Sequence, residues 1–369
     1  MATTTVSPCH DARHIAALLD LPEIKQLIAD LDETRWTGRP GYPLRVMVGA
    51  ALIKSVYCLP TWTRTARLIS EHAALQQAIG GAPSHWACYR FAAKLREHGD
   101  MLTACLDRVL GSLREAHPEM GQTVAIDGSD MPAYANGHKH VGNKNGPLRT
   151  RFADPDAGWG HRSSISTRKG GAFYGYKLHA AVDTATELPL AWTVRAANEP
   201  EQGEVAGLLD SVMEREFAVS VCVMDKGYDG QPMHDVCEAR GIRPVIALKE
   251  TPAVKAGEHK PPSCEHGEWT FAGADAKRQA TKWRCPTGEC TPASKWVKAD
   301  RLHPLIPHGS ERFKALYRQR TSVEREFGRL KNEYGLTPLR VRRLPRVTLH
   351  ASLTILAQLA SALLITRDT

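Results

Sequence analysis

Apolar residues recur at three- and four-residue spacing through about the first hundred residues, the period of a helix with one buried face. His14–Leu19 and Ile24–Ile28 begin the pattern, and Leu44–Leu59 is an almost unbroken apolar run that stops before Pro60. The same spacing predicts helices at 63–70, 84–98 and 101–117. We therefore expect residues 1–118 to form an all-helical region.

The period of the pattern changes after Gly121. Short apolar runs at 123–126, 174–182, 188–194, 219–224 and 243–248 are typical of strands, and a helix is predicted at 231–240. A hairpin followed by a strand–helix–strand unit indicates a mixed sheet covered by helices. The predicted fold class is therefore α/β, a mixed α+β domain.

Residues 250–310 break this rhythm because they are rich in Pro, Gly, Lys, Cys and Trp, and we interpret them as an inserted β-rich subdomain. A strong helix is predicted from Glu311 to about Tyr334, and a final apolar helix at Ala351–Ile365. The sheet domain is thus expected to comprise 119–249 and 311–369. The last run is too short to span a bilayer, so no membrane partner is expected.

Composition and charge narrow the class of partner. The chain has 369 residues and 48 Lys plus Arg against 40 Asp plus Glu, a net charge of +8, which suits a polyanion. The first residues lack the apolar core of a secretory signal. Nine cysteines, an odd number, favour free or metal-bound thiols in a reducing cytoplasm over a disulfide framework.

Two aspartates are predicted to end strands of the sheet. Asp127 follows the run at 123–126, and Asp225 follows the run at 219–224. Each one alone is explained by the preference of Asp for turns. Of the neighbouring carboxylates, Asp130 is expected to support the site or to form a turn, and Asp229 to cap the following helix.

The predicted helix at 311–334 carries a third carboxylate. At about 100° per residue, Tyr317, Arg320, Glu324 and Lys331 lie at roughly 0°, 300°, 340° and 320°, on one narrow stripe beside an apolar seam. Glu326 falls at roughly 180°, away from this stripe, and is therefore a poor candidate for an inward role. An ordinary solvated face with an Arg320–Glu324 pair explains the stripe equally well.

Three converging carboxylates would need cations. Mg²⁺ or Mn²⁺ takes oxygen ligands while retaining waters and substrate phosphates, and two such ions stabilise both the attacking and the leaving oxygen of a phosphoryl displacement. Arg and Lys on the same stripe are residue types that bind phosphate, and Tyr can donate to it or stack.

The spacing Tyr317-x2-Arg320-x3-Glu324-x6-Lys331 resembles the Y-x2-R-x3-E-x6-K signature of bacterial insertion-sequence transposases with a DDE triad. Ala125–Gly128 and Met224–Asp229 resemble the strands that carry the two aspartates in that family, and Tyr174–His179 resembles its hairpin. The resemblance covers most of the chain from residue 127 onward.

This resemblance implies a ribonuclease H-like catalytic domain in which Asp127, Asp225 and Glu324 hold two Mg²⁺ or Mn²⁺ ions. It also implies that Tyr317, Arg320 and Lys331 contact transposon-end DNA. The implied reaction is cleavage at the transposon ends by metal-activated water, followed by attack of the freed 3′-hydroxyl on target DNA. Action on two ends makes a homodimer on double-stranded DNA reasonable.

Two other functions remain open at this stage. A metal-dependent nuclease of the same fold would cut DNA without strand transfer. A DNA-binding regulator would keep the fold without catalysis, although the intact triad argues against a decayed site.

Two further groups of residues are candidates for binding. Cys264, His266, Cys285 and Cys290 could hold a structural Zn²⁺, but the usual C-x2-C pair is missing and small-residue packing is an alternative. The basic residues that follow the helix are expected to contact DNA; these are Arg340, Arg342 and Arg343. Cations of the N-terminal region could give a helix a phosphate-facing side; these are Arg64, Arg67, Arg90, Lys94 and Arg96.

Overall fold

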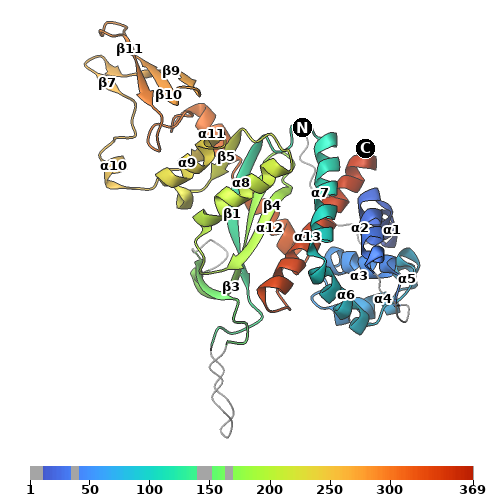
Figure 1. Ribbon diagram of the computed structural model, residues 1–369. Coiled ribbons are helices and arrows are strands. Elements are labelled where there is room, and N and C mark those ends of the chain that lie inside the picture. The colour runs from blue at the N-terminus through green and yellow to red at the C-terminus, as the bar shows by residue number, and fades with distance from the viewer. Residues whose placement is uncertain (1–10, 35–40, 139–151, 163–168, 369) are drawn as a thin grey trace.

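The computed structural model describes residues 11–34, 41–138, 152–162 and 169–368 (Figure 1). The N-terminal region is helical, as predicted. Its helices are α1 (Ala12–Asp20), α2 (Pro22–Glu33), α3 (Leu44–Val56), α4 (Trp62–Glu71), α5 (Ala73–Ile79), α6 (His85–Glu97) and α7 (Gly99–Ala116). Only α5 was not predicted.

Helix α3 is the centre of this region. Every residue of α3 except Arg45 is buried, so the helix is apolar on all sides and is covered by α1, α4, α6 and the C-terminal helix. Local capping fixes where the neighbouring helices begin, because the side chains of Thr61 and Ser84 accept hydrogen bonds from the first turns of α4 and α6.

A mixed sheet forms the second region and confirms the predicted fold class. The strands are β1 (Thr123–Pro132), β2 (Gly158–Arg162), β3 (Gly171–Asp183), β4 (Pro189–Ala196), β5 (Val221–Met224) and β6 (Arg243–Ile246). The strand order is β2-β3-β1-β5-β6, with β4 paired to β3. Strands β1, β3 and β4 are antiparallel, whereas β5 and β6 run parallel to β1.

Helices cover both faces of the sheet. On one face, Val221, Val223 and Val245 pack against α11 (Glu311–Arg318), and α12 (Thr321–Asn332) lies over β1 and β3. On the other face lie α8 (Val205–Glu214), which was not predicted, and α9 (Gln231–Glu238). Because side chains alternate along a strand, odd-numbered residues of β1 and β5 face α11 and α12.

The predicted continuous helix at 311–334 is two helices. Between them, the backbone N–H groups of Gln319, Arg320, Ser322 and Val323 donate to the carbonyl three residues earlier instead of four. This tighter winding interrupts the α-helix at Gln319 and Arg320, and α12 begins afresh at Thr321.

The last helix, α13 (Leu344–Asp368), joins the two regions and is longer than predicted. It contacts α1, α3, α6 and α7 on one side and β4 on the other. By length and composition Leu344–Arg367 could cross a membrane, but 78% of its most apolar window is buried inside the protein. It is therefore a packed core helix.

The segment between β6 and α11 projects from the main body as a separate β-rich unit (Figure 1). It contains α10 (Pro252–Lys255), the short pair β7 (Ser263–Cys264) and β8 (Gly267–Glu268), and a sheet of order β11-β10-β9. These strands are β9 (Thr270–Asp275), β10 (Ala280–Arg284) and β11 (Ser294–Lys298). The β-rich character predicted for 250–310 is confirmed.

Candidate active site at the ends of β1 and β5

Asp127 and Asp225 lie side by side on the face covered by α11 and α12. Ile126 of β1 pairs with Met224 of β5, and each aspartate is the next residue along its strand. The prediction that Asp127 ends its strand is wrong, because β1 continues to Pro132 by pairing with β3. Pairing with β5 does stop at Ile126, so both carboxylates stand where the parallel pair opens.

The pKa of Asp127 is raised to about 7, and burial is the largest cause. The negative charges of Asp225 and Glu201 also raise it, whereas the Gly128 backbone N–H, 2.8 Å from Asp127 Oδ1, and the charge of Arg320 lower it. Because burial disfavours the charged form of Asp127, a nearby cation would stabilise its carboxylate.

Glu324 faces this pair from α12. Its Oε1 accepts a hydrogen bond of 2.7 Å from Arg320 Nη1, and the guanidinium lies 6.0 Å from the centre of the Tyr317 ring. Desolvation lowers the pKa of Arg320, but the hydrogen bond to Glu324 and the charges of Glu324 and Asp127 raise it overall. Arg320 therefore interacts with carboxylates on both sides of the site.

The three acidic side chains are not gathered as tightly as ligands of a shared ion. Within the described ranges, Asp127, Asp225 and Glu324 do not form a set whose oxygens all lie within 4.8 Å. Glu324 is 52% exposed, and the Arg320–Glu324 pair expected of an ordinary helix face is formed. The structure thus places two of the carboxylates together and the third on the facing helix.

Two residues that sequence reasoning missed lie beside these carboxylates. Glu201 begins a short 3₁₀ turn after β4 and bonds to Lys177 of β3. Burial raises the pKa of Tyr228, as do the charges of Asp127, Glu201 and Asp225. Its buried hydroxyl has no hydrogen-bond partner in the part of the chain that the structure describes. The acidic run at 199–204 was the available signal for Glu201.

The donor set fits a hard divalent cation. The side chains near the opening of the β1–β5 pair offer carboxylate oxygens, the ligand chemistry of Mg²⁺ and Mn²⁺. The Tyr228 hydroxyl, which has no partner among the described residues, could bond to water or to a phosphate oxygen.

Lys331 lies near this site but is paired. Its Nζ is 3.5 Å from Asp130 Oδ1, and Arg162 Nη1 is 3.1 Å from Asp130 Oδ2. The carboxylate of Asp130 therefore orients two basic side chains, Lys331 at the end of α12 and Arg162 of β2.

Two expectations about neighbouring carboxylates are wrong. Glu326 points inward: it is fully buried and accepts hydrogen bonds from Arg329 and from Gln358 of α13. Asp229 does not cap α9, whose N-cap is Gly230. Its carboxylate instead binds Arg301 and the backbone N–H of Lys249.

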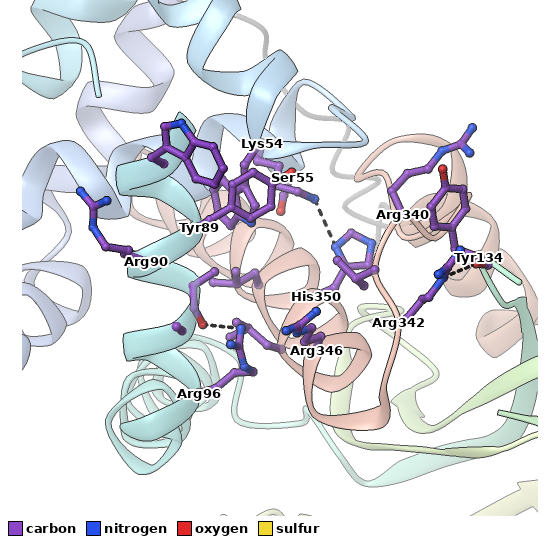
Figure 2. Close-up of a pocket in the computed structure, with 17 residues that line it drawn as sticks. Lys54, Ser55, Tyr89, Arg90, Arg96, Tyr134, Arg340, Arg342, Arg346 and His350 are labelled. Atoms are coloured by element: carbon purple, nitrogen blue, oxygen red, sulfur yellow. Dashed lines mark hydrogen bonds between the residues drawn. The ribbon is translucent and has the colours of Figure 1, made fainter. Parts of the chain in front are cut away.

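A basic and aromatic pocket of about 610 Å³ separates α6 from the start of α13 (Figure 2). Trp86 and Tyr89, which are 65% and 43% exposed, line its α6 side. Arg340 and Arg342 flank the ring of Tyr134 on the opposite side, each 5.1 Å from its centre. Lys54, Arg90, Arg96 and Arg346 also line the pocket.

The other predicted contacts near this pocket have structural partners. The backbone N–H of Arg343 donates to Asp154, and its guanidinium pairs with Asp156 at 3.2 Å. Lys94 donates to the carbonyl of Leu31 at 2.9 Å. Neither residue lines the pocket.

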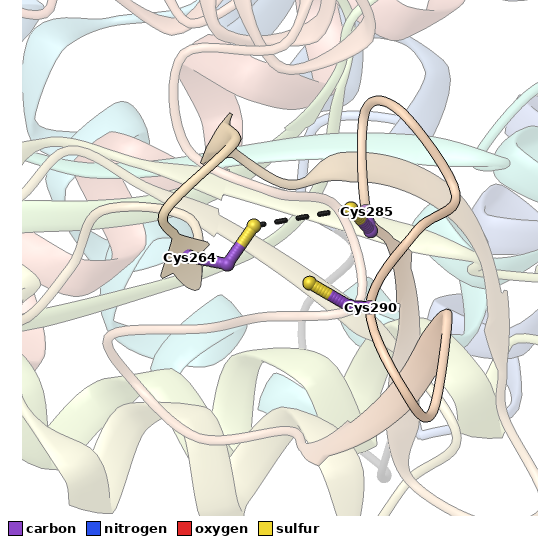
Figure 3. A group of neighbouring side chains, drawn as sticks. All are labelled: Cys264, Cys285 and Cys290. Atoms are coloured by element: carbon purple, nitrogen blue, oxygen red, sulfur yellow. Dashed lines mark hydrogen bonds between the residues drawn. The ribbon is translucent and has the colours of Figure 1, made fainter.

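Three of the four predicted zinc ligands come together in the inserted unit. The sulfur atoms of Cys264, Cys285 and Cys290 all lie within 4.8 Å of one another (Figure 3). His266 is not part of this set, since its ring nitrogens lie 3.4 and 3.5 Å from Glu265 and Glu289.

The mixed sheet with helices on both faces has the fold of a ribonuclease H-like domain. The transposase DDE domain family matches residues 118–359, and a second transposase domain, DUF772, matches residues 2–93. The chain belongs to the transposase DDE domain family and is an enzyme of the transposase type.

Comparison with solved structures finds a distant structural similarity to a transposase. A piggyBac transposase, solved as a synaptic complex with hairpin DNA, is 11% identical, with a TM-score of 0.42 over 98% of this chain and 76% of that one. No curated protein matches the chain.

Proposed function

We propose that this transposase cleaves DNA at transposon ends in a metal-dependent reaction and joins the freed 3′-hydroxyl to target DNA. The observation that carries the proposal is the placement of Asp127 and Asp225 on the face where Arg320 and Glu324 approach from α12. We assign Asp127, Asp225 and Glu324 as the ligands of two Mg²⁺ or Mn²⁺ ions.

The chain's own residues supply binding and orientation. Bound at these carboxylates, the ions would activate water and stabilise the attacking and leaving oxygens. Arg320, once released from Glu324, is placed to bind a phosphate oxygen with its planar guanidinium, and Tyr317 and Lys331 flank it along the helix. The hydroxyl of Tyr228 provides a further hydrogen-bond donor beside these carboxylates.

We assign the DNA path to the pocket between α6 and α13. Arginines neutralise phosphates, and the exposed rings of Trp86 and Tyr89 offer surfaces on which bases stack. Arg340 and Arg342 border this pocket on its far side, next to Tyr134. Because each transposon has two ends, we propose that two copies of the chain assemble on the DNA.

The test uses duplexes that carry the genomic DNA flanking the reading frame, with Mg²⁺ or Mn²⁺. Glu324→Gln is expected to lower the cleavage rate more than about 100-fold and to leave DNA binding intact, because the amide keeps the shape of the side chain without its charge. Glu311→Gln, an exposed carboxylate on α11, is the matched control and should cleave normally.

A pre-cut end with a free 3′-hydroxyl, incubated with plasmid, tests the second step. Joined products that require Glu324 support the proposal. Cleavage without joining would identify a nuclease, and cleavage by Glu324→Gln at the native rate would refute the assigned triad.

A further inference from the structure

The inserted unit has a very small core for a folded segment. Its buried residues are chiefly Trp269, Trp283 and Cys285, whereas most residues of β9 and β11 are exposed. Its strands fall between residues 263 and 298. Segments below about 40 residues rarely bury enough apolar surface to be stable and usually carry disulfides or a metal.

Three cysteine sulfurs meet at the edge of this core. Cys264 ends β7, Cys285 directly follows β10, and Cys290 lies in the loop before β11, so the three thiols tie together separate parts of the unit (Figure 3). The backbone also links these parts, since Cys285 N–H donates to the carbonyl of Ala293 at 3.0 Å.

The spacing of the sulfurs matches a shared tetrahedral ion. A Zn–S distance of about 2.3 Å in a tetrahedron places two sulfurs about 3.8 Å apart. The Cys264 and Cys285 sulfurs lie 3.9 Å apart, and all three fall within 4.8 Å. A disulfide would need about 2.05 Å, and three thiols cannot all be paired by one disulfide.

The three sulfur atoms are close enough for their charges to matter. Cys285 Sγ also lies 3.5 Å from Thr287 Oγ1. Three thiolates this close together would repel one another, and a bound cation removes that repulsion.

We propose that Cys264, Cys285 and Cys290 bind one Zn²⁺ ion that holds the inserted unit together. Thiolates are soft ligands and select Zn²⁺ over the hard cations expected at Asp127 and Asp225. We assign the fourth ligand to His266, two residues after Cys264. Its Nδ1 lies 3.5 Å from Glu289, and its Nε2 has to leave Glu265, 3.4 Å away, to bind the ion. Structural zinc sites are closed by four protein ligands, and a carboxylate commonly orients the histidine.

The experiment measures metal content rather than activity. The full-length protein, purified without chelators, is expected to contain one equivalent of zinc, released stoichiometrically when a mercurial reagent titrates its thiols. Replacement by Co²⁺ should give the thiolate-to-metal charge-transfer band and the visible spectrum of a tetrahedral site. Less than a tenth of an equivalent of zinc, or iron in its place, would overturn the proposal.

Variants assign the ligands. Cys290→Ser is expected to lose the metal, whereas Cys58→Ser, a partly buried thiol on the far side of the molecule, keeps it. His266→Ala should weaken zinc binding at least about tenfold and shift the cobalt spectrum. An unchanged affinity and spectrum in His266→Ala would refute the fourth ligand. These readouts do not depend on DNA cleavage, so they stand or fall independently of the proposed reaction.

Discussion

Replacing Arg301 with Met is predicted to destabilise the protein at the point where the inserted unit joins the sheet. The guanidinium of Arg301 donates two hydrogen bonds of 2.7 Å to the carboxylate of Asp229, which also accepts one of 2.7 Å from the backbone N–H of Lys249. Lys249 directly precedes the inserted unit, and Arg301 lies within it, just after its last strand β11. Asp229 therefore binds both the start of the insertion and the segment after its strands to the loop that begins at Asp225.

The size of the effect follows from burial. The Asp229 side chain is 0% exposed and that of Arg301 is 17% exposed. Removing one partner of a buried ion pair costs about 3–5 kcal/mol, because the other charge stays buried without compensation. Lys249 keeps one hydrogen bond to Asp229, so we expect about 3 kcal/mol for Arg301→Met. In Asp229→Asn/Arg301→Met, the two losses should fall short of additivity by about 1–3 kcal/mol.

The pKa of Asp229 predicts how the loss of stability in Arg301→Met depends on pH. Burial alone would raise the pKa of Asp229, but hydrogen bonds from Arg301 and Lys249 outweigh it and hold the pKa below 3.8. The stabilisation is therefore fully present above that ordinary value and is lost as the pH falls through the lower pKa of the folded state.

Urea unfolding followed by tryptophan fluorescence, at neutral pH and at about pH 3, measures the effect. The deficit of Arg301→Met should shrink in acid. A deficit below about 1 kcal/mol at neutral pH, or one independent of pH, would refute the reasoning.

Three further predictions concern stability and DNA binding. Burial lowers the pKa of Lys54 to about 8, so Lys54→Met should stabilise the protein by about 1–3 kcal/mol at neutral pH. The gain should decline above pH 8, because Lys54 of the native protein then loses its proton. Thermal unfolding at several pH values measures this, and a gain that does not change with pH would contradict the prediction. A Cβ at Gly49 would lie 2.6 Å from Ile79 Cγ2, so Gly49→Ala should cost about 1–3 kcal/mol in urea unfolding, and a neutral effect would contradict the packing. The double variant Arg340→Glu/Arg342→Glu should weaken duplex binding and lower the slope of log Kd against log salt concentration by about two phosphate contacts. An unchanged slope would show that these two arginines do not contact the DNA.

Each element that was predicted well is specified by the hydrophobic pattern of its own short segment. The apolar runs before Asp127 and Asp225 predict strands by themselves, whereas the parallel register that makes the two aspartates neighbours depends on residues nearly a hundred positions apart. The extension of β1 to Pro132 was missed because Gly128–Pro132 contains Gly, Asp and Pro, which are rare in strands, and the segment gains its order by pairing with β3. Helix α8 did have a local signal, the apolar spacing of Val205, Leu208, Leu209 and Val212.

The same distinction explains the site. The stripe with Arg320 and Glu324 was predictable because helical spacing is local, whereas Glu201 and Tyr228 reach the site through the path of the chain between β4 and α9. Glu326 was misplaced because only apolar neighbours defined the buried face of α12. In the folded protein, Gln358 of α13 covers that flank and donates to Glu326 at 2.6 Å.

The Arg320–Glu324 pair explains why three carboxylates proposed to hold cations are not already gathered. Arg320 bonds to Glu324, and its charge also lowers the pKa of Asp127. The pair is solvent-accessible, with side chains 21% and 52% exposed, and such pairs contribute about 0–1 kcal/mol. Divalent cations would therefore compete for Glu324 at little cost. With Glu324 holding the ions as proposed, the guanidinium of Arg320 would be released and could bind a DNA phosphate. We infer that cation binding at the carboxylates and phosphate binding by Arg320 are coupled, each favouring the other.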